Sequence, residues 1–457
     1  MAMRRLLLLH RLPAASTVAA RRYVAAATAV STGTAAAPLG QKAPPVYISS
    51  ARLDEFVRAE LSVFARRADQ PPQPLQLQEI VHASSSPEQV TEFVHAELPV
   101  RFAARIRHIE SIQGWQRVPE LAELHNMHTK SFRELRLTDP RRLAECGRAI
   151  KKIRHRHKRI PPLFAEAVKA MDQTLAFEAS GPVLRWAGVA LDRQRLEQWA
   201  DTFLLSRVST EVLMSHFVAC AETASAAEAA ATAASSSCRS LPAVAKDDSK
   251  VGIVDTRCDP WEIVQQVVQR FQEGIEPCAI ECESPCGSIH FCHVPRYLFY
   301  IVEELLRNSV RATAEACASP EDLAAKPIKV AVCADDRQVV IRVSDRAGGI
   351  PASCAEQMWS CAFSTSKVAA DPGPQYSSLL DHEVQEEISA GGRVRPWGVF
   401  GGQSPFSGRG MGLPMTRHYA SYLGGSLEVV NMPGLGVDAY VFLKRIDPGH
   451  LVPVQEQ

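Results

Sequence analysis

The chain has 457 residues, of which 46% are hydrophobic and 22% are charged, and its formal net charge is +1. This length suffices for about two or three domains, each with its own core. The near-neutral charge gives no overall field directed at nucleic acid or an acidic membrane surface, and the scattered cysteines argue against a secreted disulfide framework.

Residues 1–50 contain no acidic side chain, several arginines, and mostly Ala, Ser, Thr and Leu otherwise. This composition is typical of a mitochondrial transit peptide. We therefore expect import into the mitochondrial matrix, with a disordered leader as the alternative. The apolar run at residues 6–9 is too short to cross a bilayer, and no later stretch is long and apolar enough, so no transmembrane segment is predicted.

Residues 51–220 are predicted to form an all-α helical bundle. In residues 92–109, Val94, Leu98, Phe102 and Ile106 recur at helical spacing. Pro99 interrupts this pattern and predicts a kink or a helix start nearby. Few strand signals separate the further helical stretches, so a bundle is favoured; those stretches cover residues 140–156, 163–178 and 191–220.

A basic run occupies residues 151–159. It could dock an acidic partner, or it could be a solvated helix end, which is the more ordinary interpretation. Residues 221–250 are dominated by Ala, Ser and Thr and have few larger apolar side chains. Such a segment cannot pack a core, so we expect a low-complexity linker or a surface insertion there.

Residues 251–446 mix helix and strand signals. Helices are predicted at residues 260–272, 296–316 and 412–423, and strands at residues 288–294, 328–332, 338–343, 426–430 and 438–444. A long mobile loop is expected at residues 366–407 and a tail at residues 447–457. The order predicts an α/β sandwich, with one mixed sheet and helices on one face.

The helix over residues 300–313 carries the first chemical signal. Glu304, Asn308 and Arg311 share one face, whereas Glu303 lies about 140° around the helix from Asn308. An amide oxygen suits Mg²⁺, and a carboxylate one turn away can orient or deprotonate a nucleophile. The alternative is an ordinary amphipathic helix with a polar face.

Two glycine-containing segments follow. Asp345 comes directly after a predicted strand and precedes Gly348 and Gly349, so its carboxylate could accept a hydrogen bond from an adenine amino group above a sharp turn; a plain turn is the alternative. Residues 408–414, Gly-Arg-Gly-Met-Gly-Leu-Pro, open a helix whose free N–H groups favour phosphate.

The order of these elements, with Phe363-Ser364-Thr365 between the last two, resembles the GHKL ATPase superfamily and its Bergerat ATP-binding fold. Residues 304–313, 344–346, 412–414 and 419–427 look like the mitochondrial 2-oxoacid dehydrogenase kinases. Residues 97–106 and 205–208 resemble that family's N-terminal domain. The resemblance covers about residues 50–446 and is closest in motif to the branched-chain kinase, through Tyr300 and residues 110–112 and 423–427.

The resemblance implies a mitochondrial protein serine kinase that uses Mg-ATP to phosphorylate and inactivate the E1 alpha subunit of a 2-oxoacid dehydrogenase complex, with branched-chain favoured over pyruvate. Glu304 is then the general base, Asn308 holds Mg²⁺ and Asp345 reads adenine. The other residues implied to line the nucleotide are Arg311, Gly349, Ser364, Thr365, Gly408, Arg409, Gly410, Met411, Gly412 and Leu413. The 366–407 loop resembles an ATP lid, and the implied partners are the lipoyl-bearing E2 core and a second copy of the chain; no nucleic acid is implied.

Four residues depart from the family pattern. Ala347 stands where a glycine is usual, Arg409 where the lid has an aromatic residue, and Val437 where a threonine lies near the phosphates. Ser360 replaces an acidic residue at a potassium site, so K⁺ is an allowed rather than a required cofactor. These departures leave a non-catalytic ATP-binding scaffold open as an alternative.

Two further alternatives concern other residues. His216 could accept phosphate in a kinase that phosphorylates itself on histidine, although no acidic residue follows it. Zinc could bind a cysteine and histidine cluster, but its spacing is not that of paired C-x-x-C motifs, and free thiols are the default. The cluster consists of Cys278, Cys282, Cys286, His290, Cys292 and His293.

Overall fold

The computed structural model describes residues 49–67, 75–84, 86–176, 184–186, 188–236, 249–273, 278–361 and 410–446. The predicted lid at residues 366–407, the tail at 447–457 and nearly all of the leader lie outside these residues. The chain divides into two compact units, Met1–Arg66 and Arg67–Gln457. Of the helices that the structure describes, none combines the length and apolar character that a bilayer crossing requires.

The first unit is represented by α3 (Ser50–Arg67). The predicted bundle begins at residue 51 and so includes α3, whereas the second unit begins at Arg67. Helical periodicity marks α3 as a helix, but periodicity does not state which element a helix packs against.

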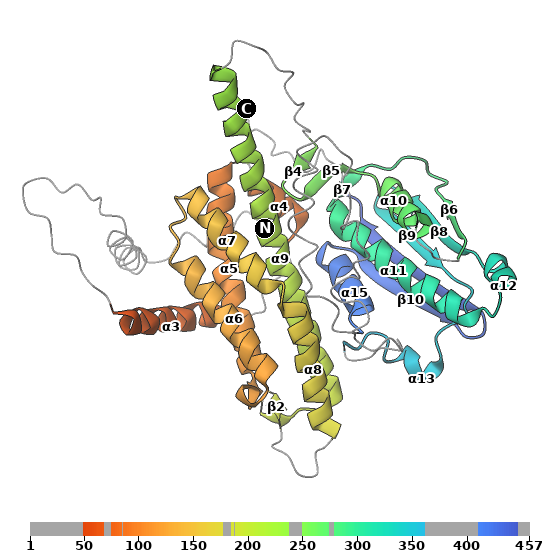
Figure 1. Ribbon diagram of the computed structural model, residues 1–457, viewed down its shortest axis with the longest axis horizontal. Coiled ribbons are helices and arrows are strands. Elements are labelled where there is room, and N and C mark those ends of the chain that lie inside the picture. The colour runs from red at the N-terminus through yellow and green to blue at the C-terminus, as the bar shows by residue number, and fades with distance from the viewer. Residues whose placement is uncertain are drawn as a thin grey trace, which may run out of the picture. The chain divides into compact units, whose positions relative to one another are not determined.

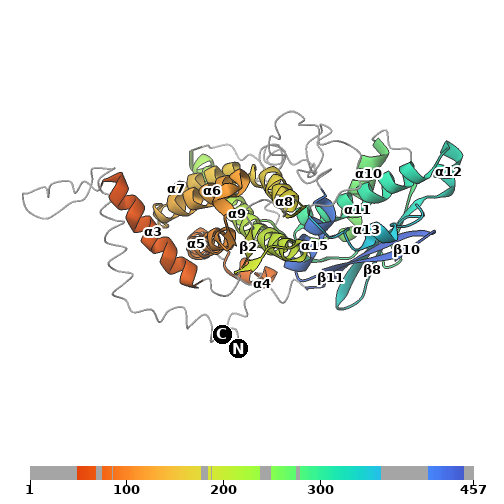
Figure 2. The ribbon, with the colours of Figure 1, turned by 90° about the horizontal axis from the view of Figure 1, so that it is seen from below.

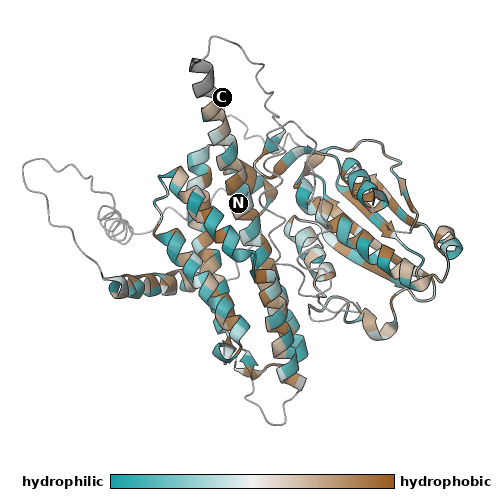
Figure 3. Ribbon diagram, in the orientation of Figure 1, coloured by the Kyte–Doolittle hydropathy of each residue, from teal (hydrophilic) through white to brown (hydrophobic). Residues whose placement is uncertain are grey.

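The helical part of the second unit confirms the predicted bundle. Its helices are α4 (Leu77–His82), α5 (Pro87–Glu110), α6 (Pro119–Arg136), α7 (Leu143–His157), α8 (Ile160–Ala176) and α9 (Arg193–Ser236) (Figure 1). Each carries hydrophobic and hydrophilic residues in alternation along its length (Figure 3). Helix α5 packs on α6 and α9, and α7 and α8 pack on α9. Short strands β1 (Ile112–Gln113), β2 (Arg185–Trp186) and β3 (Val189–Ala190) form a small sheet.

Helix α5 begins where local chemistry dictates. The Ser86 side chain accepts a hydrogen bond from the Gln89 N–H, and Pro87 occupies the first helical position, where no N–H is needed. Pro99 lies inside this helix, so of the two predicted alternatives, a kink or a helix start, the helix start is excluded. The fully buried Leu98 and Phe102 on either side of it pack into the bundle core, and that burial favours a continuous helix over the break that proline alone predicts.

The basic run of residues 151–159 faces acidic side chains of neighbouring helices. Lys151 pairs with Glu222 at 2.7 Å, Lys152 with Glu134 at 3.1 Å and Arg159 with Glu123 at 3.4 Å. Arg156 also bonds Glu134, and Arg154 lies 3.9 Å from Glu211. The run is therefore an intramolecular connection among α6, α7 and α9 rather than a wholly solvated helix end.

Residues 221–236 are helical, where the sequence predicts a low-complexity linker or a surface insertion over 221–250. Helix α9 continues through Ala- and Glu-rich sequence to Ser236, and β4 begins at Lys250. Ala and Glu have high intrinsic helix propensity, so a segment that cannot form a core can still extend an existing helix. Residues 237–248 lie outside the described part of the chain.

The C-terminal part is the predicted α/β sandwich. A five-stranded sheet has the order β10 (Ser426–Met432), β11 (Gly436–Lys444), β9 (Gln338–Ser344), β8 (Ile328–Ala334) and β6 (Ile280–Glu283), antiparallel except for the β6–β8 pair. A smaller sheet joins β4 (Lys250–Val251), β5 (Val254–Cys258) and β7 (Phe291–His293). Helices α10 (Pro260–Glu273), α11 (Pro295–Ala316) and α15 (Gly412–Tyr422) lie on one face of the larger sheet (Figure 2). Short helices α12 (Pro320–Ala325) and α13 (Ala352–Ala355) complete this part.

Alternation along the strands explains this layering. In β9, Val339, Ile341 and Val343 are buried, while the residues between them are more exposed. This period of two directs one apolar face of the sheet toward the helices. The sheet thereby places the end of β9, at Ser344, beside the middle of α11.

Candidate nucleotide site

The adjacent carboxylates of Glu303 and Glu304 on α11 lie in different environments. The Glu303 carboxylate lies 3.1 Å from Arg270 of α10 and 3.0 Å from Arg307, so two guanidinium groups neutralise it. Glu304 lies instead toward α15, with Arg307 at 3.9 Å. Glu303 is therefore the carboxylate held by both arginines, and Glu304 remains the predicted general base.

Gly412, at the first turn of α15, makes room for Glu304. A Cβ atom added there would lie 2.7 Å from the Glu304 Oε2 atom, closer than real contacts allow. Glu304 is 3% exposed, and its carboxylate lies against the first turn of α15. Asn308, one turn further along α11, is half-exposed on the same face. Arg311 is more exposed and lies 4.0 Å from Glu315, so the described residues do not direct it into the site.

Asp345 is held by three donors. The Ser309 hydroxyl donates to Oδ2 at 3.0 Å, and the main-chain N–H groups of Ala347 and Val437 donate to Oδ1 at 3.1 and 3.3 Å. Burial raises the pKa of the Asp345 carboxyl above its ordinary value, although these hydrogen bonds oppose the rise. Val437 therefore lies beside Asp345.

The turn after Asp345 depends on its glycines. Gly348 and Gly349 have φ values of +92° and +81°, a region that disfavours side chains. The Asn431 amide accepts from the Ile350 N–H at 2.7 Å and donates to the Ile350 carbonyl at 2.8 Å. The Ala347 N–H in this turn donates to the Asp345 carboxylate.

The glycine loop is described from Gly410 onward. Gly410 has a φ of +71°, Met411 is fully buried and Leu413 is half-buried at the start of α15. Four other expected nucleotide-lining residues lie outside the described residues: Ser364, Thr365, Gly408 and Arg409. Ser360 lies at the edge of the described region, where its N–H donates to the Gln357 carbonyl at 2.9 Å.

The alternative zinc ligands do not converge. The Cys278, Cys286 and Cys292 thiols each donate to a different main-chain carbonyl, those of Val310, Ala334 and Thr256. Across the described ranges, no three Cys, His, Asp or Glu side chains are grouped as a metal would require. The proximity of these residues in sequence is therefore lost once β6 and β7 join different sheets.

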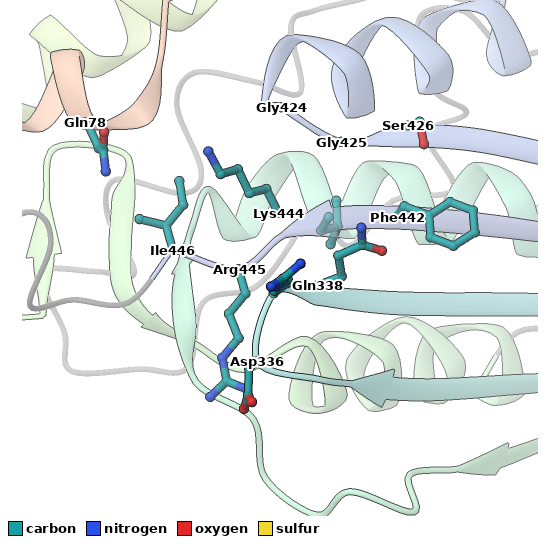
Figure 4. A pocket seen from close by; sticks show the side chains of 12 residues that line it. Gln78, Asp336, Gln338, Gly424, Gly425, Ser426, Phe442, Lys444, Arg445 and Ile446 are labelled. Atoms are coloured by element: carbon teal, nitrogen blue, oxygen red, sulfur yellow. The ribbon is translucent and has the colours of Figure 1, made fainter.

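A cavity of about 680 Å³ lies at the opposite strand ends, lined in part by Gln338, Gly425, Lys444 and Arg445 (Figure 4). Gln338 begins β9, whereas Asp345 follows the end of that seven-residue strand. This cavity is therefore separate from the residues around Asp345 and is not the nucleotide site.

Comparisons with known proteins agree with the geometry. A family model described as mitochondrial branched-chain alpha-ketoacid dehydrogenase kinase matches residues 74–255. A second, described as histidine kinase-, DNA gyrase B- and HSP90-like ATPase, matches residues 293–446. The chain belongs to the mitochondrial 2-oxoacid dehydrogenase kinase family. It is a protein kinase of that type.

Curated relatives of this kinase are identical to it at about a quarter of the aligned positions. Mitochondrial pyruvate dehydrogenase (acetyl-transferring) kinase of Arabidopsis thaliana is 26% identical over 366 residues, covering 78% of this chain and 84% of that protein. Isozyme 4 of Ictidomys tridecemlineatus is 24% identical and isozyme 4 of Homo sapiens 23%, each over 414 residues, covering 86% of this chain and 85% of the relative.

Ser309 and Asn431 are site residues that sequence reasoning missed. Ser309 follows Leu305 by four residues and Ile301 by eight, so it is a polar residue within the apolar stripe of α11. A polar residue within an apolar stripe is a signal of a buried polar contact that the sequence contains. Asn431 gave none, because its role depends on the pairing of β10 with β11 next to the Asp345 turn.

Proposed function

We propose that this kinase transfers the terminal phosphate of ATP to a serine of the E1 alpha subunit of a 2-oxoacid dehydrogenase in the mitochondrial matrix, and so inactivates it. The observation that carries the proposal is the position of Glu304, buried beside Gly412 at the start of α15 and one turn from Asn308. A base, a metal ligand and a phosphate-binding helix start are what phosphoryl transfer requires.

Each residue has a distinct role in this proposal. Glu304 accepts the proton of the substrate serine hydroxyl, Asn308 holds Mg²⁺ through its amide oxygen, and Asp345 accepts a hydrogen bond from the adenine amino group. Mg²⁺, when bound, neutralises phosphate charge. The amide oxygen of half-exposed Asn308 is a donor of the hard type that Mg²⁺ prefers. The loop at Gly410–Leu413 offers main-chain N–H groups to the phosphates, together with Gly408, Arg409, Ser364 and Thr365.

The substrate preference is the finer part of the proposal. We favour branched-chain over pyruvate E1, since the model matched by residues 74–255 is the branched-chain one. The full-length relatives named above are pyruvate dehydrogenase kinases, so pyruvate E1 is the competing substrate. The lipoyl-bearing E2 core and a second copy of the chain are the proposed partners, residues 366–407 the proposed ATP lid, and K⁺ an additional proposed ligand.

The test is phosphosite mapping by mass spectrometry. Each purified E1 is incubated with the protein and Mg-ATP, with Asn308→Ala as the matched control. We expect phosphoserine on branched-chain E1 alpha with wild type and none with Asn308→Ala. Phosphorylation of pyruvate E1 alone would reverse the preference, and ATP binding without transfer to either E1 would favour the scaffold.

The histidine-kinase alternative is disfavoured by the position of His216. This side chain is 1% exposed, its Nε2 atom lies 2.6 Å from the Ser84 hydroxyl, and burial lowers its pKa to about 4. A phosphate on this nitrogen would displace Ser84 inside the folded chain. Label that survives acid treatment, as phosphoserine does, would separate the two kinase classes.

A further inference from the structure

We propose that Ser309 is a positioning residue that makes the site selective for a purine with a 6-amino group. The inference rests on the proposed function, because it assigns adenine recognition to Asp345. It adds a second residue, on a different element, that determines how the Asp345 carboxylate meets the base.

Ser309 is placed for this role by α11. It is 7% exposed and follows Asn308, and its hydroxyl donates to Asp345 Oδ2 at 3.0 Å across 36 residues of sequence. The Ser309 hydroxyl thus links α11, which carries the proposed metal ligand Asn308, to the end of β9, where Asp345 is proposed to bind adenine. A serine in an apolar stripe has no packing advantage over alanine, so its contribution is the hydrogen bond.

The selectivity for a 6-amino group follows from the number of hydrogen-bond acceptor positions on the Asp345 carboxylate. A carboxylate has about four lone-pair positions, and Oδ1 of Asp345 uses two for the N–H groups of Ala347 and Val437. Ser309 takes one of the two on Oδ2. A single acceptor position then remains for a ligand. An amino group at purine position 6 donates to it, whereas an oxygen at position 6 meets a second acceptor and is repelled.

Ser309 is the one hydroxyl donor to Asp345 among the residues that the structure describes. Val437 offers Asp345 only its main-chain N–H, at 3.3 Å. Oδ2 would have no hydroxyl donor without Ser309. The carboxylate would then be freer to rotate and easier to protonate, and a protonated carboxyl can donate to a 6-oxo group.

The experiment compares ATP with ITP, whose base carries oxygen in place of the amino group. Dissociation constants are measured by calorimetry on the full-length protein, together with kcat and KM on purified E1. Ser309→Ala should weaken ATP binding by about tenfold and ITP binding much less, so the preference for ATP falls by about tenfold. The loss should appear in KM for ATP, with kcat at saturating ATP kept.

Two variants control for packing. Ser309→Thr keeps the hydroxyl and should restore the ATP preference. Thr313→Val removes a buried hydroxyl one turn further along α11, which makes no hydrogen bond to the residues that the structure describes, and should leave the preference unchanged. An unchanged ATP-to-ITP ratio in Ser309→Ala, or an equal loss in Thr313→Val, would overturn the inference.

The outcome also separates this inference from the proposed function. If wild type binds ATP and phosphorylates neither E1, while Ser309→Ala still loses the preference, the role of Ser309 stands and the kinase proposal falls. If wild type binds ATP and ITP equally, the role of Ser309 is wrong even where E1 becomes phosphorylated.

Discussion

Both the helical bundle and the nucleotide-binding part bury polar side chains, but the surroundings of these side chains differ. In the bundle, burial lowers the pKa of His128 and His157 well below its ordinary value, so both rings are neutral in the core. In the nucleotide-binding part, Glu304 and Asp345 are also buried, and each lies in close contact with a glycine, Gly412 and Gly436 respectively.

The glycines show the same contrast. Gly147, inside α7, has nothing within 4 Å of where a Cβ would lie, whereas Gly412 and Gly436 would bring a Cβ within 2.7 Å of Glu304 Oε2 and 2.0 Å of the Asp345 carbonyl. Gly147 therefore has room for a side chain, whereas Gly412 and Gly436 do not. The difference teaches that stability and chemistry are carried by separate sets of buried residues.

The largest expected effect separates two neighbouring carboxylates. Glu304→Gln should lower turnover by about 10²–10⁴-fold with ATP binding kept, since it removes a general base. Glu303→Gln should lower the free energy of unfolding by ~1.5–3 kcal/mol, because Arg270 and Arg307 lose their shared partner, yet it should keep turnover. Phosphorylation rates and denaturant melts measure both, and equal losses of turnover in the two variants would remove the distinction.

Gly412→Ala should come next, with kcat lowered by about 10- to 100-fold. The added Cβ would displace the Glu304 carboxylate, and small misplacements of a catalytic group have effects of this size. Steady-state kinetics with purified E1 measure it. A normal kcat in a well-folded Gly412→Ala protein would mean that Glu304 acts from another position.

The third prediction concerns pH and the bundle. Burial lowers the pKa of His108 to about 4, and that of His128 and His157 well below its ordinary value. Below pH about 6.5 the unfolded chain binds protons that the folded chain does not, so stability should fall with falling pH by ~1.4 kcal/mol per pH unit for each such histidine.

Chemical denaturation between pH 7.5 and 5 tests this. His128→Gln removes one of these groups and should make the pH dependence shallower by the same increment. Unfolding free energies that do not change over this range, or an unchanged slope in His128→Gln, would contradict neutral burial of these rings.

The smallest expected effect is an increase in the free energy of unfolding. Gly147→Ala lies inside α7 with room for a methyl group and should raise the free energy of unfolding by ~0.5–1 kcal/mol, because alanine loses less backbone entropy in a helix. Turnover should be unchanged. A destabilised Gly147→Ala protein would show that the bundle is packed more tightly at this point than the structure indicates.

Local signals predicted part of the site. Glu304 and Asn308 could be placed on one face because helical geometry relates residues four apart, and Asp345 could be placed at a strand end by alternation. The contacts of Asp345 with Ser309 and Val437 span 36 and 92 residues. They could not be predicted, since they depend on strand register and helix packing.

The sequence by itself determined the longer helices, the strands from Ile328 onward, the apolar faces and the residues with suitable chemistry, because these follow from short-range periodicity and side-chain type. Only the tertiary structure decided which carboxylate is neutralised by arginines, how far α9 extends and which hydroxyl holds Asp345. These outcomes depend on which helix and strand surfaces pack together. Many such surfaces have the same local sequence pattern, so the pattern does not specify the partner.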